Sequence, residues 1–131
     1  WPYNKMIKDP VSTGYVINWH EKRRPLGDAK KYRIKEYIHL YTVQEMIFAL
    51  STHGPFGLSI DWDESWYDLS RLFSPKHKRV AGRHFVTAVG SDSYGIKIRN
   101  SWGSSWGGKG YGFISFDSLA EYNASAWLIR A

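Results

Sequence analysis

The stretch RHFVTAVGSDSYGIKIRNSWGSSWGGKGYGFISF, residues 83–116, decides which fold the sequence predicts. Apolar residues alternate with other residues in three runs, at 84–90, 94–100 and 111–116. The turn-like sequences SDS and GSSWGGKG separate these runs. A period of two residues is typical of strands, and clusters of glycine and serine are typical of turns. Because strands that are close in sequence tend to pair antiparallel, we predict three antiparallel strands in this stretch.

His84 and Asn100 stand at the ends of the first two predicted strands. If these strands form a hairpin, the two residues face one another at its open end, although sixteen positions separate them. Asn100 has the parity of Ile96 and Ile98, so its amide should point to the buried face, where an unpaired polar group costs about 1–3 kcal/mol. An asparagine carbonyl that accepts a hydrogen bond from an imidazole N–H leaves the other ring nitrogen free to act as a base.

The rest of the chain gives weaker structural signals. Thr42 and Glu45 have the T-x-x-E spacing of a capping box, and the apolar residues that follow share one helical face until Gly54 and Pro55 end the helix. Alternation at 56–60 predicts a further strand. We expect residues 61–83 to form a short helical turn and an exposed loop, residues 126–131 an edge strand, and residues 1–35 loops with one or two short strands.

Composition limits the classes of protein open to this sequence. Its 131 residues fit a single domain, 1–131, and 43% hydrophobic and 17% aromatic residues are typical of a globular protein. No apolar run approaches the roughly 20 residues that cross a bilayer, so we expect a soluble protein and no membrane partner. The histidines lack metal-binding spacing, and we predict no metal and no cofactor. Without cysteine, disulfides do not indicate a compartment.

The net charge of +6 is concentrated near the start of the chain. Residues 1–40 hold nine Lys/Arg against four Asp/Glu, whereas residues 41–131 hold nine against eight. Basic segments can bind phosphates, but no recognised nucleic-acid motif accompanies this charge, so we expect no nucleic-acid partner. An acidic protein partner accounts for the excess equally well.

Three motifs in residues 84–111 carry a family resemblance: HFVTAVG, NSWG and WGGKGY. They resemble the C-terminal half of the papain-like cysteine peptidases, in which H-[AF]-V-x-x-V-G, N-S-W-G and W-G-x-x-G-Y follow one another at the same spacing. Upstream the resemblance is looser and includes WPY at residues 1–3. It implies an α+β papain-like fold, in which this chain forms the C-terminal antiparallel β-sheet or barrel half with one flanking amphipathic helix.

The resemblance also implies roles for single residues. His84 resembles the general acid/base of the family, and Asn100 resembles its orienting partner. Trp102 is expected to shield their hydrogen bond from water, and Trp106 to flank the leaving-group side of the cleft. The other expected cleft residues are Ser59, Gly82 and Arg83, in the pocket for the residue before the cleaved one, and Trp1 and Pro2 at the cleft border. Arg83 then predicts a cationic rim for that pocket.

The sequence departs from the family in lacking a nucleophile. The catalytic cysteine and the oxyanion-hole glutamine belong to the N-terminal half of the family, and nothing here matches its C-G-[SA]-C-[WY] segment. The first residue is Trp1 rather than methionine, which indicates a processed product, a fragment or one chain of a cut precursor. We therefore expect a companion chain or removed N-terminal half to carry the cysteine and the glutamine.

The activity that the resemblance implies is cysteine-type endopeptidase cleavage of peptides or proteins, with this chain inactive alone. A thiolate from the companion half would attack the peptide carbonyl, and His84 would protonate the leaving amine. The alternative is a catalytically inactive papain-like module that acts in protein binding or assembly. Because the chain lacks a cysteine, both interpretations are open from the sequence.

Overall fold

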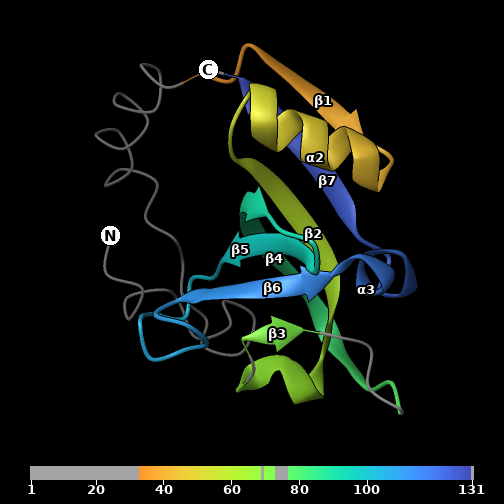
Figure 1. Ribbon diagram of the computed structural model, residues 1–131, viewed down its shortest axis with the longest axis vertical. Coiled ribbons are helices and arrows are strands. Elements are labelled where there is room, and N and C mark those ends of the chain that lie inside the picture. Colours follow the sequence, from red (N-terminus) through yellow and green to blue (C-terminus); the bar gives the residue numbers. More distant parts are fainter. Residues whose placement is uncertain (1–32, 69, 73–76, 131) are drawn as a thin grey trace, which may run out of the picture. The chain divides into compact units, whose positions relative to one another are not determined.

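The strands predicted in residues 84–116 pair with their neighbours in sequence and form the middle of a larger sheet (Figure 1). The structure is a computed structural model that describes residues 33–68, 70–72 and 77–130. From Ile34 onward, the described residues form one compact unit. Trp1, Pro2 and the loops expected before residue 33 lie outside the described residues, and the single domain over 1–131 stays a prediction.

The described residues contain one seven-stranded sheet with the order β1-β7-β2-β4-β5-β6-β3. The strands are β1 (Glu36–Leu40), β2 (Phe56–Asp63), β3 (Arg71–Leu72), β4 (Val80–Ser91), β5 (Gly95–Arg99), β6 (Tyr111–Ser115) and β7 (Ser125–Arg130). Neighbouring strands run antiparallel, apart from β3 and β6, which run parallel. The α+β architecture that the sequence predicts is therefore confirmed, with a sheet that is mixed rather than purely antiparallel.

Two strand predictions need correction. β7 is not an edge strand, because β1, which the sequence analysis did not predict, pairs with its outer side while β2 pairs with the other. The expected exposed loop does not extend over all of residues 61–83, because β2 continues to Asp63 and β4 already begins at Val80. Trp62 extends the buried alternation of β2 and is 2% exposed, and Trp66 in the following turn is fully buried.

The capping box forms as expected at the start of α2 (Val43–Thr52). The Thr42 hydroxyl accepts a hydrogen bond from the Glu45 backbone N–H at 3.1 Å, and the Glu45 carboxylate accepts one from the Thr42 N–H at 3.0 Å. Backbone N–H groups of Tyr41 and Thr42 hold the pKa of Glu45 below its ordinary value. Met46 and Ala49 are the buried residues of the helix, so α2 is the flanking amphipathic helix that the sequence predicts.

Two shorter helical elements complete the described fold. The 3-10 helix η3 (Glu64–Tyr67) is the expected helical turn after β2. The helix α3 (Phe116–Glu121) was not predicted, because its six residues follow β6 directly and are too few to establish a helical period. No helix in the described ranges is long and apolar enough to cross a membrane.

The core lies on one face of the sheet, where alternate residues of neighbouring strands are buried. Ile96 and Ile98 of β5 and Ile114 of β6 have no exposed surface, and they pack with the buried residues of β2, β4 and α2. Burial of each such side chain stabilises the fold by about 1.5–3 kcal/mol. Because the period is two, the residues between them point to the opposite face of the sheet.

Candidate active site

The side chains of His84 and Asn100 meet in the structure, as the sequence predicts. The distance between His84 Nε2 and Asn100 Oδ1 is 2.8 Å. His84 lies within β4, and Asn100 follows the last residue of β5, next to the cross-strand pair of Thr87 and Arg99. Asn100 is only 7% exposed, so its amide points to the buried side of the sheet, as its parity indicates.

A third group fixes which atom of this pair donates the hydrogen bond. The backbone N–H of Ser101 donates to the same Asn100 Oδ1 atom at 2.8 Å. If the amide were turned around, its NH2 group would face the Ser101 N–H, and two donors cannot bond to each other. Oδ1 is therefore the acceptor, His84 Nε2 carries a proton, and in the neutral ring the Nδ1 atom keeps a free lone pair.

Two aromatic rings contact the imidazole, and a third stacks on one of them. Trp102 stacks on His84 with ring centroids 4.8 Å apart, and Trp62 meets the same ring edge-on, also at 4.8 Å. Tyr67 of η3 stacks on Trp102, with the two ring centroids 5.2 Å apart. The contact that the sequence predicts for Trp102 is present, whereas Trp62 and Tyr67 were missed. The parity of Trp62 with Leu58 and Ile60 of β2 was the signal that could have found it.

A hollow of about 110 Å³ lies against the histidine ring. It is lined by Trp62, Tyr67, Ala81, Gly82, Arg83, His84 and Trp102. The predicted cleft residue Gly82 is therefore placed at the histidine, and a Cβ atom added there would meet no atom within 4 Å.

Trp106, the residue expected on the leaving-group side of the cleft, is mostly buried. It is 6% exposed, and its indole N–H donates to the carbonyl of Trp66 at 3.3 Å. The turn that brings it inward needs glycine, because Gly103, Gly107 and Gly110 have φ values of +85°, +54° and +88°. Trp106 does border an open hollow of about 400 Å³, and its role beside a leaving group stays a prediction.

Asp63, at the end of β2, holds the segment that carries two of these rings. Its carboxylate accepts hydrogen bonds from the Ser65 N–H and hydroxyl, the Arg79 N–H and the Tyr122 hydroxyl, at 2.7–2.9 Å. Burial alone would raise the pKa of Asp63, but these hydrogen bonds outweigh it and the pKa lies below its ordinary value. Burial and the bond to Asp63 raise the pKa of Tyr122.

Arg83 and Ser59, the other predicted pocket residues, contact each other across β4 and β2. Arg83 Nε donates to the Ser59 hydroxyl at 2.9 Å, and Nη2 donates to the Asn123 carbonyl at 3.0 Å. Nη1 forms an ion pair with Asp61 at 2.9 Å. Hydrogen bonds from Asn123 and then Arg83 lower the pKa of Asp61. The expected cationic group is therefore accompanied by a carboxylate that the sequence analysis did not include.

Two polar atoms of the site, Trp62 Nε1 and Asn100 Nδ2, have no hydrogen-bond partner among the described residues. Asn100 Nδ2 is buried and makes no hydrogen bond. Asn100 also lines an open hollow of about 490 Å³ on the β4–β5 side. The other residues that line it are Phe85, Val86, Thr87, Arg99, Ser101 and Gly103.

Comparison with known proteins places this geometry in one family. The pattern of the papain family cysteine proteases matches residues 3–126. Testin-2 of Mus musculus is 29% identical over 97 residues, which cover 64% of this chain and 29% of that protein. Cathepsin O of Homo sapiens is 37% identical over 79 residues, which cover 56% of this chain and 24% of that protein. The chain thus spans about a quarter to a third of the length of these relatives.

Solved structures agree with this assignment. The crystal structure of xylellain, a cysteine protease from Xylella fastidiosa, superposes with a TM-score of 0.71 at 27% identity, over 80% of this chain and 43% of that one. Procathepsin L 3 of the Tenebrio molitor larval midgut, at 23% identity and a TM-score of 0.58, shares the fold over 75% of this chain and 36% of that one. This chain belongs to the papain family of cysteine proteases.

Proposed function

We propose that this chain supplies the acid–base half of a papain-like cysteine peptidase site, and that a cysteine outside this sequence is the nucleophile. The observation that carries the proposal is the 2.8 Å contact between His84 Nε2 and Asn100 Oδ1. It directs the other nitrogen, Nδ1, away from the asparagine with a lone pair that can take a proton. Family membership supports the same chemistry.

His84 would move a proton twice in this reaction. Nδ1 takes the proton of the companion thiol, and the resulting thiolate attacks the peptide carbonyl carbon to form a tetrahedral intermediate. When the C–N bond breaks, the imidazolium gives its proton to the leaving amine. A water then loses a proton to Nδ1 and hydrolyses the thioester, which releases the acid and restores the thiol.

Asn100 and the surrounding rings would serve this proton transfer without taking part in it. A neutral carboxamide orients the ring but adds no negative charge that would compete with the thiolate for the imidazolium. Trp102 covers the ring and lowers the access of water to the hydrogen bond. In this arrangement the pair remains oriented while Nδ1 gains and loses its proton.

The experiment that tests the proposal uses the assembly that contains this chain, isolated through an affinity tag on it. Iodoacetamide should label a cysteine of another polypeptide or segment, since this sequence has none. The label should abolish cleavage of a fluorogenic peptide, and His84→Ala should abolish cleavage without dispersing the assembly. A preparation that cleaves peptides with every thiol blocked contradicts the proposal.

A second candidate function is protein binding by a catalytically inactive papain-like module. The absence of cysteine from all 131 residues favours it. In that case the isolated assembly binds its partner, contains no cysteine that reacts faster than a free thiol, and cleaves no peptide. The labelling experiment separates the two functions.

A further inference from the structure

The outer face of β5 and β6 carries cations and aromatic rings in register. Because Ile96, Ile98 and Ile114 point into the core, the residues between them point outward. Lys97 lies opposite Phe113 on β6, and Arg99 lies opposite Tyr111. On the far side of β6, Arg71 of β3 also pairs with Phe113. We call this surface, with Tyr94, the basic–aromatic face; its residues are Arg71, Tyr94, Lys97, Arg99, Tyr111 and Phe113.

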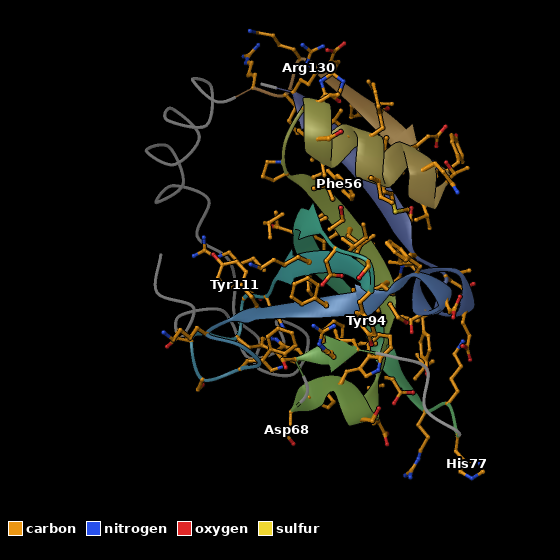
Figure 2. All side chains as sticks on the ribbon, in the orientation of Figure 1. Phe56, Asp68, His77, Tyr94, Tyr111 and Arg130 are labelled. Carbon is orange, nitrogen blue, oxygen red and sulfur yellow. The ribbon has the colours of Figure 1, made fainter. Side chains whose placement is uncertain are left out.

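Two of its cations lie over its rings. The Arg71 guanidinium carbon is 4.8 Å from the ring centre of Tyr94 and 5.3 Å from that of Phe113. The Lys97 ammonium is 5.2 Å from the ring centre of Tyr111 and 5.9 Å from that of Phe113. Tyr111 begins β6 and Tyr94 lies near its other end (Figure 2), so the face follows the whole strand. Such contacts hold the cations at fixed places on the surface.

No carboxylate among the described residues forms an ion pair with these cations. The ion pairs in the described ranges use Arg79, Arg83 and Arg130, and none uses a cation of the basic–aromatic face. Asp92, in the turn before β5, accepts hydrogen bonds from two backbone N–H groups. At the other end of the face, Arg99 lines the 490 Å³ hollow that Asn100 shares.

We propose that the basic–aromatic face binds an extended acidic peptide segment of a protein partner through its carboxylates. Lys97 and Arg99 are two residues apart on one strand, which places their side chains about 6.8 Å apart. Alternate side chains of an extended peptide have the same spacing, so carboxylates at every second position match these cations. Arg71, across β6, would take a further carboxylate. The inference does not depend on the proposed peptidase activity.

The rings decide against single-stranded nucleic acid, whose phosphates also repeat along an extended chain. Proteins that bind it gain about 1–3 kcal/mol per base by stacking bases on aromatic faces. Here Arg71 and Lys97 already lie over the rings of Tyr94, Tyr111 and Phe113, where a base would stack. The cations of the basic–aromatic face, rather than its rings, are therefore available to a ligand. A peptide that carries carboxylates and no bases fits this arrangement.

The test measures binding of a fluorescent peptide with alternating glutamate and threonine to the full chain, by anisotropy. The expected result is saturable binding that weakens as salt shortens the Debye length from about 10 Å at 0.1 M to about 3 Å at 1 M. Lys97→Gln with Arg99→Gln should weaken binding by about tenfold or more. The charge-conserving pair Lys97→Arg with Arg99→Lys should bind as the parent does, and a glutamine–threonine peptide should not bind.

The matched control removes two charges elsewhere. Arg79→Gln with Arg130→Gln gives the same net charge, and both side chains are exposed and pair with carboxylates outside the basic–aromatic face. It should leave binding within about twofold of the parent. Equal loss in both double variants, or no binding at low salt, overturns the proposal. Tighter, Lys97- and Arg99-dependent binding of oligo-dT or of a heparin oligosaccharide also overturns it in favour of a polyphosphate or a sulfated glycan.

Discussion

The imidazole of His84 and the carboxamide of Asn100 are held in one mutual orientation, because the Ser101 N–H occupies the same oxygen that accepts from Nε2. These hydrogen bonds by themselves determine that Nδ1 is the ring nitrogen with the free lone pair. In the proposed mechanism the pair has two roles that mutation can distinguish, since His84 would move a proton and Asn100 would orient the ring.

Removing the base should cost more activity than removing its partner. In the active assembly, His84→Ala should lower kcat by about 10²–10⁴-fold, the range for loss of a general acid/base. Asn100→Ala should lower it by about 10–100-fold, since the ring remains but is no longer oriented. His53→Ala, at the exposed end of α2, is the matched control and should leave kcat unchanged. Equal losses for His84 and Asn100 would contradict the division of roles.

Trp102 should protect the Nε2 proton from water. The indole stacks on the imidazole at 4.8 Å, so Trp102→Ala opens the hydrogen bond to solvent, whereas Trp102→Phe keeps an aromatic cover. We expect the alanine variant to speed exchange of the His84 Nε2 proton in NMR spectra and to lower kcat by about tenfold. The phenylalanine variant should lie between it and the parent. An unchanged exchange rate in the alanine variant would remove the shielding role.

Asp63 should make the fold sensitive to acid. Its pKa in the folded chain is below the unfolded value of about 3.9, so its stabilisation is present above that pH and is lost as the pH falls through the folded pKa. Asp63→Asn should therefore lower the free energy of unfolding at neutral pH by about 2–4 kcal/mol and flatten the loss of stability below pH 4. Denaturant titrations at several pH values measure both.

Tyr122→Phe is the milder companion variant, because it removes only one of the bonds to Asp63. It should cost about 1–2 kcal/mol and leave the acid dependence nearly as steep as in the parent. If Asp63→Asn keeps the parent's pH dependence, the carboxylate of Asp63 does not hold this segment as described.

Arg83 should influence the residue that precedes the cleaved bond, if it lines that pocket. In the active assembly, peptides with an acidic residue there should be cleaved no worse than leucine peptides. Asp61 forms an ion pair with the Arg83 guanidinium and offsets part of its charge. Arg83→Gln should therefore reduce the ratio of kcat/KM for acidic peptides to kcat/KM for leucine peptides by only about 2–5-fold. Asp61→Asn, which frees the cation, should raise that ratio. Unchanged ratios in both variants would remove Arg83 from the pocket.

Short-range patterns in the sequence account for much of the fold and for the central pair of the site. The capping box predicts the start of α2, and the parity of Asn100 predicts its buried amide. Both depend on residues within one strand or one helical turn. The motifs HFVTAVG and NSWG then supply the family, which no period of hydrophobic residues could have supplied.

Local sequence patterns do not predict which distant segments pair or which partners polar side chains meet. β1 joins the sheet through β7, about ninety positions later in the sequence, so no local pattern marks it. Nothing in the sequence assigns Asp61 to Arg83, because the ion pair forms only once β2 and β4 align. The ring of Tyr67 reaches the site through η3, which Asp63 caps by accepting a hydrogen bond from the Ser65 N–H.

The reactivity of the companion thiol tests the central claim most directly. In the isolated assembly, the rate of iodoacetamide labelling is measured against pH for the parent and for His84→Ala. We predict that the parent thiol reacts well below the ordinary thiol pKa of about 8.5, because protonated His84 stabilises the thiolate, and that the variant returns the midpoint to about 8.5. The same midpoint in both proteins, or no reactive cysteine in the assembly, would contradict the account.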